Sequence, residues 1–146
     1  MKYCINLSCE EDTLSLGNKI AQNLKSGCFF ALRGELGAGK TIFVKGLAKG
    51  LNIKTRVTSP TFTIMCQYSG ARELYHFDLY RVTEQECYDM GFDDFFFDKN
   101  AICAVEWSEH LTCFPPKTVT ITLKKTSDNS RCAIIEDEFD VLKGIL

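Results

Sequence analysis

The sequence predicts a three-layer α/β fold with a mostly parallel central sheet and added antiparallel hairpins. The first observation is an apolar run at residues 28–32 that leads through a glycine-rich loop into a helical pattern. The second is an almost wholly apolar run at 101–105 that ends in an acidic residue, as a central strand does. The third is two pairs of alternating segments, around 69–72 and 126–130, that have the form of β-hairpins.

The size and composition of the chain fit one domain spanning residues 1–146. Its 146 residues, 45% hydrophobic with 11 phenylalanines, can bury an ordinary core and leave no room for a second catalytic domain. The formal charge of −2 excludes a global attraction to nucleic acid or to an anionic membrane. The N-terminus lacks the pattern of a secretion signal, and no stretch reaches membrane-spanning length, so we expect a cytoplasmic protein.

The chain contains eight cysteines, and no two of them form a C-x-x-C pair. In a reducing compartment such cysteines act as small apolar residues. We therefore expect neither a zinc site nor disulfide bonds.

The N-terminal segment predicts a strand followed by a helix. Residues 2–7 alternate, with the apolar side chains on one face. Residues 8–11 have the S-x-x-E form of a helix capping box, and the helix should run to about Lys25, where a Ser-Gly pair ends it. Glu10 and Thr13 are first-turn residues of this helix. The alternative is that they lie near the base of a bound nucleotide.

Residues 34–41, GELGAGKT, match G-x-x-x-x-G-K-[ST] at every fixed position. The glycines let successive backbone N–H groups point at one anion from a helix N-terminus, so a P-loop NTPase fold is expected. Lys40 should reach the β- and γ-phosphates of a nucleotide, and the Thr41 hydroxyl should be a Mg²⁺ ligand. The residues expected to hold the nucleotide are Glu35, Leu36, Gly37, Ala38, Gly39, Lys40 and Thr41. The alternative is a glycine-rich turn that only joins a strand to a helix.

Residues 59–61, Ser-Pro-Thr, form a turn by their chemistry, because proline fixes its own φ and restricts the residue before it. A second interpretation is a mobile switch loop in which Ser59 or Thr61 senses the γ-phosphate or the magnesium ion. Both interpretations remain open. The preceding basic stripe is most simply a solvated helix face and consists of Lys45, Lys49, Lys54 and Arg56.

Two acidic residues stand at the ends of predicted strands. Asp78 follows the hairpin formed by 61–68 and 73–77, where a metal-linked carboxylate belongs, and its alternative role is that of a turn residue or helix cap. His76 beside it has the pattern of a strand histidine. Glu106 ends the apolar run and is the Walker-B-like candidate, either an outer-shell magnesium partner or the group that orients the attacking water. Its alternative is a cap for the next turn.

The remaining segments predict the following elements. A short helix covers 83–91, and the aromatic and acidic segment 92–98 belongs to the core or to a partner contact. Residues 118–125 and 131–136 form the second hairpin, and 139–146 are expected to form a short helix.

Four motifs stand together in order: GELGAGKT at 34–41, SPTF at 59–62, HFDLYR at 76–81 and VEW at 105–107. This combination resembles the bacterial TsaE family, the small P-loop ATPase of tRNA threonylcarbamoyladenosine synthesis. The resemblance covers roughly residues 7–113. Four spaced motifs are far more specific than a phosphate loop alone.

The resemblance implies a function beyond what the residues themselves show. The family does not attach the threonylcarbamoyl group to tRNA itself. It joins TsaB and TsaD, meets tRNA only through that complex, and hydrolyses ATP to keep the complex turning over. On matching positions, Lys40 and Thr41 would bind phosphate and magnesium, with Lys40 also serving catalysis, and 59–61 would be the switch. Glu10 and Thr13 match the stretch near the nucleotide more loosely.

The same resemblance implies roles for three residues in ATP hydrolysis or in coupling to the partners, namely Asp78, Glu106 and Trp107. Asp78 and Glu106 would join Thr41 around the magnesium ion. One departure is Ser108, where many relatives have proline after Glu-Trp. This departure concerns the local geometry of Trp107 and leaves the carboxylate in place.

Other functions remain alternatives at this stage. A small-molecule P-loop kinase would need a lid with arginines and an acceptor pocket, and arginine is scarce here. A nucleotide-dependent interaction module would bind without productive hydrolysis, and a direct RNA-binding protein would use the basic stripe. No N-K-x-D guanine-reading motif is present, which favours ATP.

Overall fold

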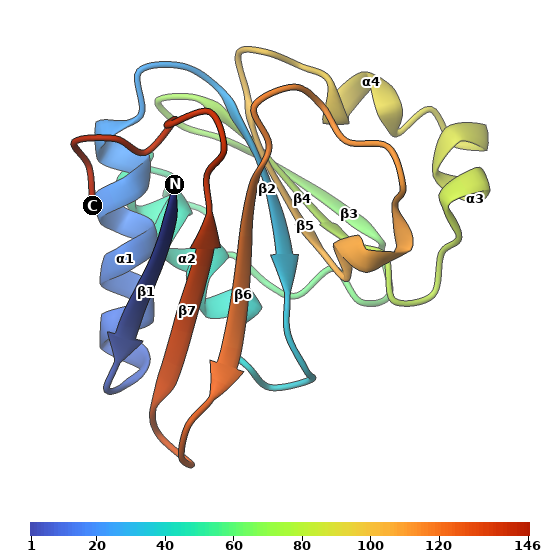
Figure 1. Ribbon diagram of the computed structural model, residues 1–146. Helices are drawn as coiled ribbons and strands as arrows, with labels where there is room; N and C mark the ends of the chain where they lie inside the picture. Colours follow the sequence, from blue (N-terminus) through green and yellow to red (C-terminus); the bar gives the residue numbers. More distant parts are fainter.

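The computed structural model describes residues 1–146 and contains one seven-stranded mixed sheet in the order β1-β7-β6-β2-β5-β4-β3 (Figure 1). The four central strands run parallel, and antiparallel strands are added at both edges. The strands are β1 (Lys2–Leu7), β2 (Cys28–Arg33), β3 (Met65–Ser69), β4 (Glu73–Asp78), β5 (Ile102–Glu106), β6 (Val119–Lys125) and β7 (Arg131–Glu136). The predicted parallel core and both predicted hairpins are confirmed.

Helices cover the two faces of the sheet and complete the three layers. The helices α1 (Glu10–Asn23) and α2 (Lys40–Gly50) pack on one face, and the short helices α3 (Glu84–Asp89) and α4 (Asp93–Phe96) on the other (Figure 1). Strand β2 is buried from both sides, since its alternate residues belong to two separate apolar clusters. None of the helices is long and apolar enough to cross a membrane.

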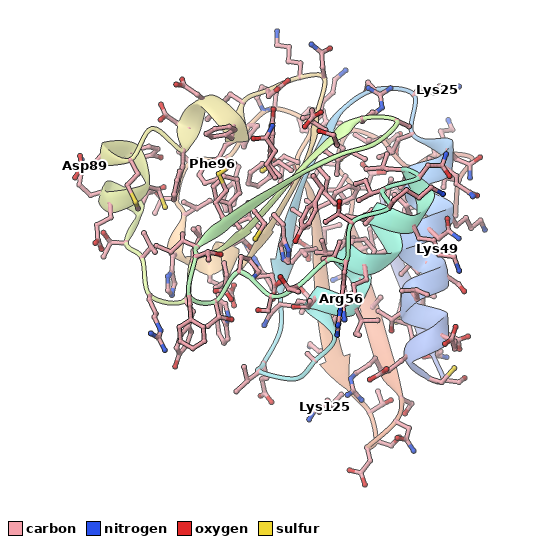
Figure 2. The ribbon with its side chains drawn as sticks, turned by 180° about the vertical axis from the view of Figure 1, so that it is seen from behind. Lys25, Lys49, Arg56, Asp89, Phe96 and Lys125 are labelled. Carbon is pink, nitrogen blue, oxygen red and sulfur yellow. The ribbon has the colours of Figure 1, made fainter.

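The second apolar cluster is built largely from aromatic rings. Phe96 of α4, labelled in Figure 2, is 3% exposed and meets Phe77 of β4 edge to face, with 4.9 Å between the ring centroids. Phe96 meets Phe29 of β2 in the same way at 5.6 Å. The segment 92–98 therefore supplies core side chains, one of its two predicted roles.

Helices α1 and α2 approach each other at two glycines. A Cβ added at Gly46 would lie 2.2 Å from the carbonyl oxygen of Leu14, and one added at Gly17 would lie 2.4 Å from that of Phe43. Real Cβ atoms do not come this close to backbone atoms. The two helix backbones can therefore be in direct contact only because both positions lack a side chain.

Helix α1 starts differently from the predicted capping box. Its N-cap is Cys9, which makes no side-chain capping hydrogen bond. The Asp12 carboxylate instead accepts a hydrogen bond from the Ser8 N–H at 2.8 Å, so Asp12 takes the role expected of Glu11. The helix also ends at Asn23, two residues before the predicted end, because Leu24 is already extended.

Two other predicted boundaries were wrong. The first strand of the hairpin begins at Met65 because Ile64 has a φ of 70° and its N–H donates to the Pro60 carbonyl at 2.7 Å, which closes a turn. The C-terminal tail forms turns in place of a helix. The buried Asp137 carboxylate accepts hydrogen bonds from Val141 and Leu142, and Asp140 has a φ of 53° that helical residues do not adopt.

Hydrogen bonds to the Glu84 carboxylate connect α3 to the segment after β5, and we predict that these bonds make a pH-dependent contribution to the free energy of unfolding. Glu84 accepts hydrogen bonds from the hydroxyl and N–H of Thr112, both at 2.7 Å, and from the Cys113 N–H at 3.2 Å. These bonds, the Thr112 hydroxyl first, lower the pKa of Glu84 to about 2. Because this pKa lies below the unfolded value of about 4.3, the stabilisation is fully present above about pH 4.3 and is lost as the pH falls through about 2.

The variant Glu84→Gln should therefore unfold at a lower temperature than the wild type at pH 7. Glu84 is partly exposed, so we expect a cost of about 1 kcal/mol, or a few degrees. The difference should shrink as the pH falls from about 4.5 to about 2. Thermal denaturation followed by circular dichroism measures it, with the exposed Glu138→Gln as the matched control. An equal difference at neutral and acidic pH would contradict the assignment.

Candidate functional site

The glycine-rich loop connects the end of β2 to the start of α2, as the sequence motif requires. Gly37 and Gly39 have φ values of 79° and 105°, in the left-handed region that only glycine adopts readily. The Ala38 N–H donates to the Glu35 carbonyl at 3.0 Å. The N–H groups of Gly37, Gly39, Lys40 and Thr41 donate to no protein acceptor, and the last three lie at the start of α2. Four backbone donors of the loop and helix start are thus available to an anion.

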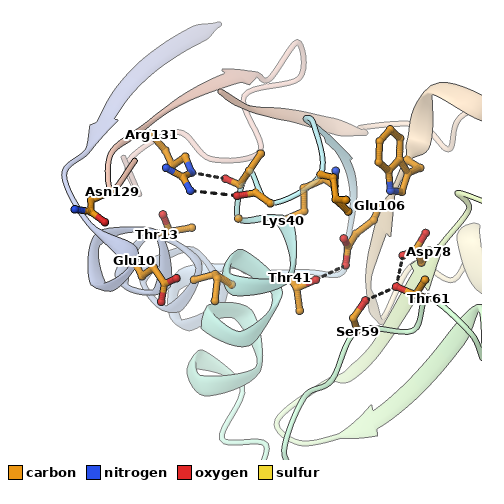
Figure 3. Close-up of a pocket in the computed structure, with 16 residues that line it drawn as sticks. Glu10, Thr13, Lys40, Thr41, Ser59, Thr61, Asp78, Glu106, Asn129 and Arg131 are labelled. Carbon is orange, nitrogen blue, oxygen red and sulfur yellow. Dashed lines mark hydrogen bonds between the residues drawn. The ribbon is translucent and has the colours of Figure 1, made fainter. Parts of the chain in front are cut away.

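This loop forms one wall of a cavity of about 270 Å³ (Figure 3). The structure brings nearly all the sequence-predicted site residues to its lining. These are Glu10, Thr13, Leu36, Gly37, Ala38, Gly39, Lys40, Thr41, Ser59, Thr61, Asp78, Glu106 and Trp107. Glu35 is the exception, since its side chain lines a neighbouring hollow behind the loop. Three lining residues were not predicted, namely Ile42, Asn129 and Arg131.

The two predicted carboxylates lie side by side at the carboxyl ends of neighbouring strands. Asp78 of β4 pairs in register with Glu106 of β5, and both side chains are buried. Glu106 Oε2 accepts a hydrogen bond from the Thr41 hydroxyl at 3.0 Å (Figure 3) and lies 2.5 Å from His76 Nε2. His76 is fully buried in β4, so it is a strand histidine as predicted, and it also orients the carboxylate.

The Ser-Pro-Thr segment is tied to Asp78 by a chain of hydroxyl groups. The Thr61 hydroxyl donates to Asp78 Oδ2 at 3.2 Å (Figure 3). Because a hydroxyl has only one hydrogen to donate, the Ser59 hydroxyl is the donor in its 2.7 Å bond with Thr61. Asp78 Oδ1 accepts from the Tyr80 N–H at 2.9 Å. Asp78 is therefore a turn residue and a cavity residue at once. The position of residues 59–61 at the cavity edge allows both of their predicted roles.

Lys40 is held close to the loop and beneath an aromatic ring. Its side chain is buried, its ammonium group donates to the carbonyls of Gly34 and Glu35, and it lies 4.1 Å from the centre of the Trp107 ring. Burial lowers the pKa of Lys40 below its ordinary value, while Glu106 and two other acidic residues oppose this shift.

Trp107 owes its position to a backbone bend directly after Glu106. Its φ of 59° lies in the left-handed region, where a non-glycine residue is strained. The next residue, Ser108, starts the short 3₁₀ helix η1 (Ser108–His110), and its buried hydroxyl donates to the Leu32 carbonyl at 3.1 Å. Ser108 stands where the family resemblance leads one to expect proline, and its side chain donates a hydrogen bond that a proline side chain could not.

Arg131 supports the loop from the second hairpin, and sequence reasoning missed it. Its guanidinium donates to the carbonyls of Ala38 and Gly37, both at 3.1 Å (Figure 3). The parallel pairing of β6 with β2 carries the hairpin tip, including Asn129, to the loop. No local signal predicts this pairing, since strand order is a tertiary property.

The basic stripe lies outside the cavity. Lys49 and Arg56, labelled in Figure 2, are exposed, and none of the four basic residues lines the site. At the phosphate-loop end the cavity combines free backbone donors and the Lys40 ammonium group with the Thr41 hydroxyl and the carboxylates of Asp78 and Glu106. The fold and this site define a P-loop protein of the α/β class.

The comparisons with known proteins place the chain within this class. The family profile described as "Threonylcarbamoyl adenosine biosynthesis protein TsaE" matches residues 7–133. The chain therefore belongs to the TsaE family, a family of tRNA threonylcarbamoyladenosine biosynthesis. The match extends past the predicted limit near residue 113 and takes in all of β6 and the first half of β7.

Individual relatives agree with the family assignment. The chain is 39% identical to the tRNA threonylcarbamoyladenosine biosynthesis protein TsaE of Treponema pallidum over 130 residues, which are 88% of this chain and 95% of the relative. It is 41% identical to the TsaE protein of Bacillus subtilis over 123 residues, covering 83% and 77% of the two chains. The crystal structure of Bacillus subtilis YdiB superposes with a TM-score of 0.78 at 32% identity, covering 94% of this chain and 86% of that one.

Proposed function

We propose that the protein is an ATP-binding, weakly hydrolysing P-loop protein that acts with TsaB and TsaD in the threonylcarbamoyladenosine modification of tRNA. The observation that carries the proposal is the set of unbonded N–H groups of Gly37, Gly39, Lys40 and Thr41 beside the Lys40 ammonium group. A triphosphate supplies the acceptors that these donors lack. In this proposal residues 1–146 form a single ATPase domain that works in the cytoplasm and meets tRNA only through the complex.

The residues also fit a magnesium ion. Mg²⁺ prefers oxygen ligands and keeps several waters, so it needs only one or two protein groups beside the phosphates. The Thr41 hydroxyl and the Glu106 carboxylate, 3.0 Å apart, supply such oxygens, with Asp78 in the neighbouring strand. When bound, the ion would neutralise charge on the β- and γ-phosphate oxygens.

The other residues have separate tasks in the proposed reaction. Lys40 would leave the Gly34 and Glu35 carbonyls and bind the β- and γ-phosphates. Glu106, kept in place by His76, would orient the attacking water, and Trp107 would shield this end of the cavity. Ser59 and Thr61 would respond to the γ-phosphate and pass the nucleotide state to the partners through the segment that they belong to.

Measuring phosphate release tests this proposal. The protein alone should release phosphate from ATP slowly, and addition of TsaB, TsaD and tRNA should accelerate the release. A phosphorylated metabolite in place of free phosphate would favour the kinase alternative. Absence of phosphate release even with the partners and tRNA would favour a nucleotide-dependent interaction module.

A further inference from the structure

Two cysteines from opposite ends of the chain lie in contact on the outer face of the sheet. Strand β1 pairs antiparallel with β7, so that Cys4 stands opposite Ile134 and Cys132 opposite Asn6. The two thiols occupy a diagonal of the same face, and their Sγ atoms are 3.1 Å apart. No other pair of the eight cysteines makes such a contact.

The face that carries this pair is accessible. The neighbours Tyr3 and Ile5 pack toward α1 and α2, so Cys4 points to the opposite side of the sheet. In Figure 1 no helix lies in front of β1, β7 and β6 on that side. Cys4 is exposed and Cys132 is partly exposed, so a small reagent can reach both sulfur atoms.

We propose that Cys4 and Cys132 form an oxidisable dithiol, which closes to an intramolecular disulfide on reaction with a low-molecular-weight disulfide such as oxidised glutathione. The sequence alone predicted no disulfide, because the two residues are separated by 128 positions and no C-x-x-C pair is present. The contact arises from the pairing of the first strand with the last. This inference concerns a site apart from the nucleotide cavity and does not depend on the proposed ATPase function.

The chemistry proceeds in two thiol–disulfide exchanges. The Cys4 thiolate attacks one sulfur of oxidised glutathione, forms a mixed disulfide and releases one glutathione thiolate. Cys132 then loses its proton and attacks Cys4 Sγ, which forms the protein disulfide and releases the second glutathione. Two protein thiols are oxidised and one glutathione disulfide is reduced to two thiols, so atoms and electrons balance.

The surroundings of the two thiols favour this order of attack. The hydrogen bond with Cys4 and partial burial raise the pKa of Cys132, so that Cys132 keeps its proton while the more exposed Cys4 reacts first. None of the other cysteines makes a sulfur–sulfur contact. Cys28, Cys87 and Cys103 are buried, Cys66 is partly exposed, and the exposed Cys9 and Cys113 are free to form mixed disulfides or links to another chain.

Closure of this disulfide should stabilise the protein. It links the edge strand β1 to β7 across almost the whole length of the chain, and long loops lose the most entropy on cross-linking in the unfolded state. We expect the melting temperature to rise by about 5 °C or more. Cys132 directly follows Arg131, whose guanidinium donates hydrogen bonds to the carbonyls of Gly37 and Ala38.

The experiment treats the reduced full-length protein with oxidised glutathione and measures its intact mass. Peptide mapping of the wild type should show a link between Cys4 and Cys132 with the loss of two hydrogen atoms, and any glutathione gained should lie on the exposed Cys9 or Cys113 and not on Cys4 or Cys132. Dithiothreitol should reverse both the mass change and the rise in melting temperature. Cys4→Ser and Cys132→Ser should fail to close and should each carry glutathione on the remaining partner, while the exposed control Cys9→Ser should close as the wild type does.

Three results would overturn the proposal. One is a wild type whose Cys4 and Cys132 both stay alkylatable after the treatment. Another is a stable glutathione adduct on Cys4 with Cys132 still reduced. The third is a disulfide-linked dimer through Cys4, which would show that the two thiols of one chain do not combine.

Discussion

Replacement of Lys40 by alanine should abolish ATP binding as measured by isothermal titration calorimetry. The ammonium group is the only cation among the loop residues that line the cavity. Loss of its charge-assisted contacts with the phosphates should cost on the order of 3 kcal/mol, or more than about 100-fold in affinity. The binding isotherm of the variant should therefore be flat at concentrations that saturate the wild type.

A matched control is Lys45→Ala, which removes a lysine from the same helix but outside the cavity. This variant should keep the wild-type affinity. Because Lys40 also bonds to the Gly34 and Glu35 carbonyls, melting temperatures of both variants need to be compared with the wild type. Unchanged ATP affinity in a folded Lys40→Ala protein would contradict the assignment.

Glu106→Gln should retain ATP binding and lose turnover. Glutamine has the same size, so its side-chain oxygen can still accept from Thr41 and His76, but it carries no charge to orient and polarise water. We expect phosphate release to fall by a factor of about 10² to 10³, in the range found when one preorganised polar group is removed from an active site. Single-turnover assays of phosphate release, together with calorimetry, separate turnover from binding.

Glu138→Gln provides the control for this prediction, since Glu138 is exposed and does not line the cavity. It should release phosphate at the wild-type rate. Wild-type phosphate release by the Glu106→Gln protein would contradict the role assigned to this carboxylate. Full activity of the modification system with TsaB, TsaD and tRNA, despite lost turnover in the variant, would favour the interaction-module interpretation.

The loop and the strands that lead to it could be predicted because each has a local cause. The glycines of 34–41 permit the left-handed backbone, and the apolar runs before the loop and before Glu106 mark strands buried on both faces. The alternating segments of both hairpins likewise carry their own signal. Boundaries failed where single hydrogen bonds decided them, as with Asp12 at α1 and Asp137 in the tail.

The rest of the site depends on which strands become neighbours. The contact between His76 and Glu106 needs β4 beside β5, and the contact of Arg131 with the loop needs β6 beside β2. Neither pairing has a signature in a single sequence. The proximity of Cys4 to Cys132 has the same origin, because it follows from the pairing of β1 with β7.

The glycine crossing of α1 and α2 has a consequence for the dimensions of the nucleotide cavity. Helix α1 carries Glu10 and Thr13 on one wall, and α2 begins at the phosphate loop on another. The spacing of these walls is therefore fixed further along the two helices, where Gly17 and Gly46 allow their backbones to touch. A methyl group at either position would push the two helices apart and widen the cavity. The dimensions of the cavity therefore depend on two glycines that do not line it.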